Sequence, residues 1–81
     1  MTTTEPTANQ PTLVGTVVIY RGRRYTVTAD PELVDNAGVA PVRNSRGDTN
    51  YLFVAVDGTG QIVRAATRRE PWATVTTTPP H

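Results

Sequence analysis

The side chains best suited to binding chemistry in this sequence are arginines, because all eight basic residues are Arg. A guanidinium group stays charged at every accessible pH and binds phosphate or carboxylate through two parallel hydrogen bonds. Six of them lie near the first predicted turn or in and after the last strong strand; these are Arg21, Arg23, Arg24, Arg64, Arg68 and Arg69. This pattern predicts recognition of a phosphate-bearing or acidic partner.

Two aromatic residues, Tyr51 and Phe53, alternate with aliphatic residues in the segment 49–56. If the even-numbered residues of this segment face the core, both rings point outward near Arg64. Exposed rings beside arginines stack single-stranded bases at about 1–3 kcal/mol per base, and they also suit protein interfaces. In the opposite register both rings are core residues, and the sequence leaves these two registers open.

Catalysis has few candidate residues here. The single His is the terminal His81 and the single Ser is Ser45, in a polar turn. A nucleophile needs a base held within hydrogen-bond reach, which a terminal His after two prolines does not provide. The fifteen Thr residues suit strands and tails better than catalysis. We therefore expect no enzyme activity, no cofactor and no small-molecule substrate.

A metal site is equally unsupported. The acidic residues Asp30, Glu32 and Asp35 are clustered, but Pro31 interrupts the alternation of ligands that a calcium loop requires. The sequence has no Cys to form a thiolate zinc site. Asp30 and Glu32 are better explained as residues that cap a helix start, so we expect no metal.

Two hairpins must position these side chains. Apolar, β-branched and alternating segments predict strands at residues 13–20, 24–29, 49–56 and 61–66. Turns between them are marked by Gly22 and by Asp57–Gly60. A weaker strand at 39–42 contains Pro41, which has no amide donor and so predicts an edge or a bulge.

The segments that connect the hairpins are less regular. Residues 30–38 predict one or two helical turns, with Asp30 as the cap, Pro31 in the first turn and Gly38 at the left-handed end. A wide loop is the alternative. Residues 67–72 predict an irregular end or a short helical turn, with Trp72 plugging one end of the fold.

Length and composition set the domain organisation of the 81-residue chain. Residues 1–12 and 73–81 are rich in Thr and Pro, and we expect disordered tails there, with residues 73–75 as a candidate edge strand. Residues 13–72 then form one all-β domain. We expect a small half-open antiparallel barrel of about four or five strands, with at most one short helical turn.

The first hairpin also carries a family resemblance. Residues 15–27, GTVVIYRGRRYTV, contain a glycine, an apolar strand, a basic glycine turn, then an aromatic residue and a valine. This order resembles the first hairpin of small barrels of the Tudor and KOW kind. The resemblance implies a small β-barrel, and at the level of the fold it implies binding of nucleic acid or methylated residues.

The remaining features concern location and partners. The net charge is only +1, so any electrostatic recognition must be local. The chain lacks Cys, a signal-like start and an apolar segment of membrane-spanning length, which predicts a cytoplasmic protein without membrane contact. The preference for Arg over Lys indicates a high-GC bacterium or its phage.

These observations predict a non-catalytic module that recognises nucleic acid through an arginine and aromatic surface. The alternative is a protein-binding adaptor or phage-type accessory protein. The predicted contact residues are the same for both functions: Arg21, Arg23, Arg24, Tyr51, Phe53, Arg64, Arg68 and Arg69.

Overall fold

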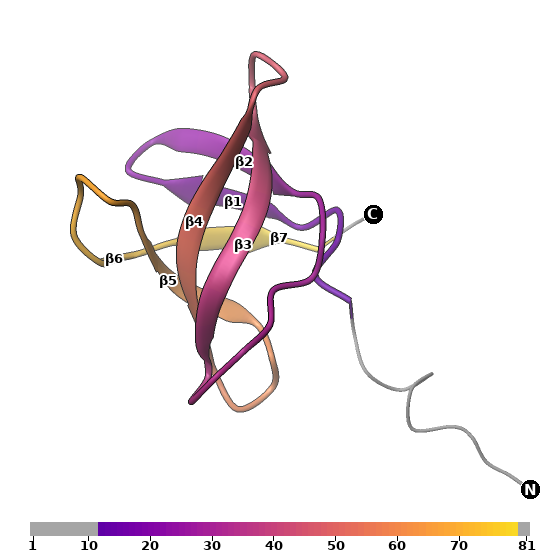
Figure 1. The fold of residues 1–81 in the computed structure, drawn as a ribbon, viewed down its shortest axis with the longest axis vertical. Coiled ribbons are helices and arrows are strands. Elements are labelled where there is room, and N and C mark those ends of the chain that lie inside the picture. Colours follow the sequence, from indigo (N-terminus) through magenta and orange to yellow (C-terminus); the bar gives the residue numbers. More distant parts are fainter. Residues whose placement is uncertain (1–11, 80–81) are drawn as a thin grey trace, which may run out of the picture.

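The computed structural model describes residues 12–79, which form one antiparallel sheet and no helix. The strands of this region are β1 (Val17–Tyr20), β2 (Arg23–Val27), β3 (Ala37–Asn44), β4 (Thr49–Val56), β5 (Ile62–Ala66), β6 (Ala73–Thr74) and β7 (Thr76–Thr78). Their order in the sheet is β6-β5-β4-β3-β2-β1-β7, which curls into a nearly closed barrel (Figure 1). The predicted all-β barrel is confirmed, with seven described strands in place of four or five. Residues 12–79 contain no helix that would reach across a bilayer.

The barrel is closed by a segment that the sequence assigned to a tail. β6 pairs with β5, and β7 pairs with β1. Between them, the amide of Val75 donates to the carbonyl of Val63 at 3.2 Å. The prediction of a disordered tail is therefore wrong for residues 73–78, whereas the candidate edge strand at 73–75 is confirmed in part, as β6. The free edges of β1 and β5 supply backbone partners that composition cannot reveal. The rest of the predicted tails, residues 1–11 and 80–81, lies outside the described residues.

The β1–β2 hairpin matches its predicted turn and faces. Arg21 and Gly22 form the turn with φ of 50° and 78°, the two positive values of a type I′ turn. Tyr25 and Val27 are buried while Arg24 is exposed. β1 is shorter than predicted because Gly15, at φ 90°, bends the chain before the strand begins.

The helical turns predicted in residues 30–38 are absent, and the alternative loop is present. The carboxylate of Asp30 accepts hydrogen bonds from the amide of Leu13 and the hydroxyl of Thr12, so it caps no helix. Asp35 and Asn36, at φ 55° and 65°, form a tight turn into β3. Polar residues suited to a helix cap are equally suited to turns, which explains the wrong prediction.

Gly38 also has a different role from the predicted one. It lies within β3, where a Cβ atom would overlap the main-chain carbonyl oxygen of Glu32. The glycine therefore lets the loop before β3 lie directly against the strand.

β3 is longer and more central than predicted, despite Pro41. It lies between β2 and β4, from Ala37 to Asn44. The carbonyl of Pro41 accepts from the amide of Thr28 at 3.0 Å, so the nitrogen of Pro41 also faces the β2 side. β2 has already ended at Val27, so the one hydrogen bond that the proline nitrogen cannot donate, to the carbonyl of Thr28, lies just beyond the end of that strand.

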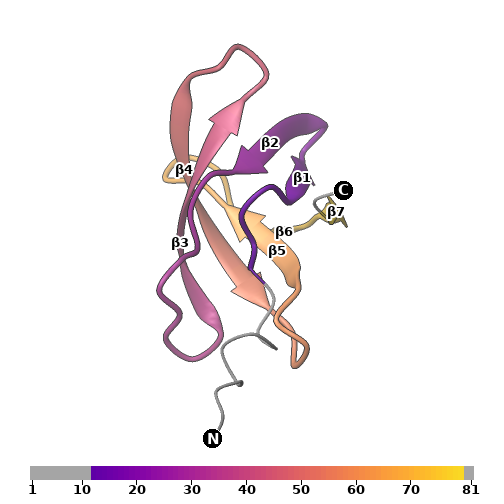
Figure 2. The same cartoon turned by 90° about the vertical axis from the view of Figure 1, so that its right-hand side faces the viewer.

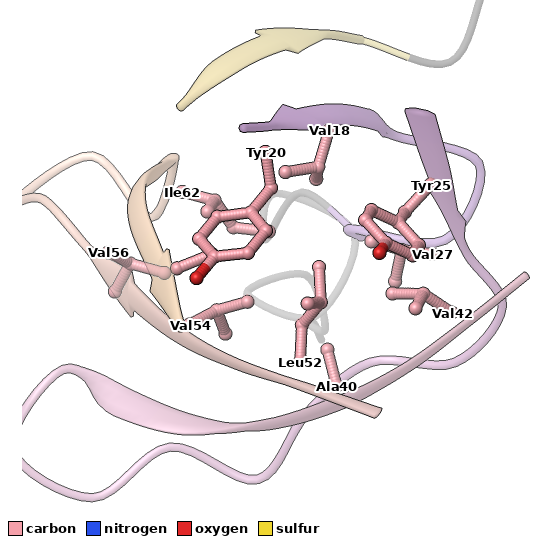
Figure 3. Close-up of a cluster of buried hydrophobic side chains, with 11 residues drawn as sticks. Val18, Tyr20, Tyr25, Val27, Ala40, Val42, Leu52, Val54, Val56 and Ile62 are labelled. Atoms are coloured by element: carbon pink, nitrogen blue, oxygen red, sulfur yellow. The ribbon is translucent and has the colours of Figure 1, made fainter. Parts of the chain in front are cut away.

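The core settles the register that the sequence left open. Leu52, Val54 and Val56 are at most 8% exposed, whereas Tyr51 is 65% and Phe53 is 37% exposed. Figure 3 shows the first three side chains pointing inward, with Tyr20 among them.

Trp72 does not plug the barrel as predicted, because it is 48% exposed. Tyr20, fully buried, fills that role, and its hydroxyl donates to the carbonyl of Pro71 at 2.8 Å. A tyrosine suits this place because its polar tip reaches a partner at the end of the core.

Candidate nucleic-acid interface

A groove of about 890 Å³ runs along the first half of β4. Tyr51 and Phe53 project into it from the outer face of β4. Arg68 and Arg69 enter from the turn that follows β5, and Arg23 enters from the start of β2. The sheet thus brings together residues from three distant parts of the sequence.

A closed turn fixes the arginines beside the groove. The hydroxyl of Thr67 accepts hydrogen bonds from the amides of Glu70 at 3.0 Å and Arg69 at 3.3 Å. The amide of Thr67 donates to the carbonyl of Glu70 at 3.1 Å. These bonds direct the chain away from β4, so that Arg68 and Arg69 remain exposed at the turn.

Glu70 joins this turn to the first hairpin through an ion pair with Arg23. The hydrogen bond from Arg23 to Glu70 raises the pKa of Arg23 above its ordinary value. Within residues 12–79 no other ion pair occurs. Arg68 and Arg69 consequently present unneutralised charge to the groove.

Tyr20 provides a second connection between the same elements. Its hydroxyl donates to Pro71 and accepts from Nε of Arg21 at 3.3 Å. The guanidinium carbons of Arg21 and Arg23 each lie 5.8 Å from the centre of its ring. Figure 1 shows the tip of the β1–β2 hairpin next to the segment between β5 and β6. Arg21 therefore helps to join the β1–β2 hairpin to the segment between β5 and β6.

Two smaller hollows extend the groove across the outer surface. Phe53 and Arg68 line both the groove and a second hollow of about 500 Å³. Trp72 lines this second hollow and also a third, of about 480 Å³, which contains Arg64. We call this continuous surface the aromatic track; its aromatic and basic members are Arg23, Tyr51, Phe53, Arg64, Arg68, Arg69 and Trp72.

The aromatic track is more positive than the chain as a whole. Its four arginines face two acids, Glu70 and Asp35, which leaves a local charge of +2. Asp35 shares the third hollow with Arg64 and weakens the positive potential at that end. An anionic ligand is therefore favoured most at the groove, beside Arg68 and Arg69.

Six of the eight predicted contact residues lie on the aromatic track, and two do not. Arg21 instead donates a hydrogen bond to the hydroxyl of Tyr20, and Arg24 faces outward on β2 opposite Ile19. The sequence-based prediction missed Trp72. Its position directly after Pro71 and close to Arg68 and Arg69 was the available signal, because an exposed aromatic beside arginines is typical of binding surfaces.

Among residues 12–79, no group of three acidic or histidine side chains converges as metal ligands. Compared with known proteins, the chain matches no family model, no curated sequence and no solved structure at a significant level. The class defined by the fold and the site is therefore a small antiparallel barrel that carries an aromatic and arginine surface on its outer face.

Proposed function

We propose that this chain is a non-catalytic module that binds single-stranded nucleic acid along the aromatic track. The observation that supports this proposal is the continuity of three exposed rings, Tyr51, Phe53 and Trp72, with the unneutralised arginines Arg68 and Arg69. Rings of this kind stack unpaired bases, while guanidinium groups contact the phosphates between them.

The modest charge of the aromatic track sets the expected strength of binding. With few phosphate contacts, the affinity falls in the range of about 10⁻⁴–10⁻⁶ M and weakens as salt rises. Duplex ligands bind less tightly than single strands, because their bases are already stacked and do not expose their faces to Tyr51 or Trp72.

The chain carries its own reporter, since Trp72 is its single tryptophan. We expect a short oligothymidine to quench the fluorescence of Trp72 at about 50 mM salt and to bind more weakly at about 200 mM. Tyr51→Ala should reduce affinity about 5- to 150-fold. Arg68→Gln should weaken binding and lower its salt dependence.

Arg24→Gln is the matched control, because Arg24 lies outside the aromatic track. This variant changes the net charge as Arg68→Gln does, but it should keep the affinity of the natural chain. An unchanged fluorescence signal together with unchanged amide resonances at low salt would contradict the proposed function.

A protein-binding adaptor is the second candidate, and Val39 favours it. This residue lies opposite Phe53 on β3 and is 44% exposed. An exposed aliphatic side chain beside an aromatic ring adds apolar area to a protein interface but provides no stacking surface. Binding to a protein partner that resists added salt and nuclease, without any response to oligonucleotide, would select this candidate.

A further inference from the structure

One edge of β4 is only partly paired. β3 pairs with β4 from Thr49 onward, whereas β5 pairs with it only from Phe53 to Val56. The chain turns away after Ala66, at the closed turn that begins with Thr67. The first half of β4 therefore has a neighbouring strand on one side and an open edge on the other. Figure 2 shows the β3–β4 hairpin extending beyond the rest of the sheet.

The direction of the main-chain groups at this edge follows from the hydrogen bonds around it. The amide of Asn44 donates to the carbonyl of Asp48, and the amide of Val56 donates to the carbonyl of Asn36. The main-chain N–H and C=O groups of the even-numbered residues in β3 and β4 therefore point toward the other of these two strands. Main-chain groups alternate in direction along a strand. The N–H and C=O groups of Thr49 and Tyr51 consequently point to the open edge.

This open edge lies inside the groove. The groove is lined by Tyr51, whose side chain points outward, and also by Leu52, whose side chain points inward. A groove lined from both faces of one strand must cross the edge of that strand. The free main-chain groups are therefore accessible within it, close to Arg68 and Arg69.

The chemistry of these groups matches an unpaired base. In an extended residue the N–H donor and the C=O acceptor lie side by side and point in the same direction. The Watson–Crick edge of a base likewise carries a donor next to an acceptor, and proteins read it only in unpaired nucleotides. An added peptide strand would find a short edge of two outward residues, whereas Arg68 and Arg69 favour a ligand that carries phosphate.

We infer that the open edge of β4 hydrogen-bonds the Watson–Crick edge of one unpaired base through the main chain of Tyr51 or Thr49. Arg68 and Arg69 hold the adjoining phosphate. This inference rests on the proposed function and specifies its ligand as a single strand whose base edges are free. The groove then contributes hydrogen bonding, and the rest of the aromatic track contributes stacking.

The test compares oligothymidine with the same oligonucleotide built from N3-methylthymidine. The methyl group removes the donor of the Watson–Crick edge but leaves the ring face and the phosphates unchanged. We expect the methylated strand to bind at least about tenfold more weakly, because it lacks the donor that the main-chain carbonyl would accept and its methyl group keeps the neighbouring acceptor away from the amide. The amide resonances of Thr49 and Tyr51 should shift only with the unmodified strand.

Trp72→Ala is the matched control, because its ring is expected to stack on either strand and should lower both affinities by the same factor. Equal affinity of the two strands, with Trp72 quenched by both, would overturn the inference and leave the proposed function intact. Failure of both strands to bind would overturn the proposed function and the inference together.

Discussion

The two faces of β4 differ in the kind of apolar residue that they carry. The inner face has the aliphatic residues Leu52, Val54 and Val56, which are buried in the barrel (Figure 3). The outer face has Tyr51 and Phe53, which remain exposed on the groove. A barrel this narrow is filled by small branched side chains and by two tyrosines from β1 and β2. The two rings of β4 alternate with the inner residues and are thus left to the surface.

This difference separates stability from binding on one strand. The inner side chains contribute burial, which stabilises the fold in proportion to the apolar area removed from water. The outer rings are less buried than the inner side chains, and their exposed area is available to a ligand. Substitutions at neighbouring positions of β4 should therefore change one property without the other.

The largest effect is expected for Leu52→Ala. Loss of this fully buried side chain should lower the free energy of unfolding by about 2–5 kcal/mol, as measured by urea denaturation followed by circular dichroism. Tyr51→Ala, one position away, should change it by less than about 0.5 kcal/mol. Equal losses for the two variants would show that the outer ring also belongs to the core.

Gly38→Ala should have the next largest effect, because the inner side of β3 at this point is covered by the main chain of Glu32. Displacing that loop should cost about 1–3 kcal/mol in the free energy of unfolding. Gly58→Ala is the control, since a Cβ there meets no atom within 4 Å. If both variants unfold at the same urea concentration, the loop does not lie against β3 as described.

Tyr20→Phe should have a smaller effect on the free energy of unfolding, because it alters only the contact between the core and the segment that carries Pro71 and Trp72. It removes the hydroxyl that donates to Pro71, at a cost of about 0.5–1.5 kcal/mol. The fluorescence of Trp72, which directly follows Pro71 in the chain, should also change in the free protein. Tyr51→Phe, with an exposed ring, should alter stability less; a larger loss from Tyr51→Phe would contradict the role given to Tyr20.

The smallest effect concerns Asp57 in the turn between β4 and β5. Its carboxylate accepts from the hydroxyl of Thr59 and the amides of Gln61 and Thr59, which holds its pKa below the ordinary value. A lowered pKa in the folded state stabilises the fold above the unfolded pKa of about 3.9, and this stabilisation disappears as pH falls through the folded pKa.

Asp57→Ala should therefore be less stable than the natural chain at neutral pH, and the difference should shrink below about pH 4. Urea denaturation at the two pH values measures it. Oligonucleotide binding at neutral pH should not change, because Asp57 lies outside the aromatic track. A difference that stays constant with pH would mean that the carboxylate charge is not what stabilises the turn.

The sequence by itself determined the features that depend on neighbouring residues. The bounds of β4 at Thr49 and Val56, the alternation of Tyr25 and Val27 with Arg24, and the turn at Gly22 all follow from local pattern. Alternation of side chains and positive φ at glycine are short-range effects, so a sequence states them directly.

Only the tertiary structure decided which edges are paired and which surfaces meet. The strands of residues 73–78 exist because β1 and β5 expose edges to them. Trp72 is exposed because Tyr20 already fills the end of the core, and β4 keeps an open edge because β5 ends at Ala66. Each outcome is a contact between residues far apart in the chain, and local propensity carries no information about such contacts.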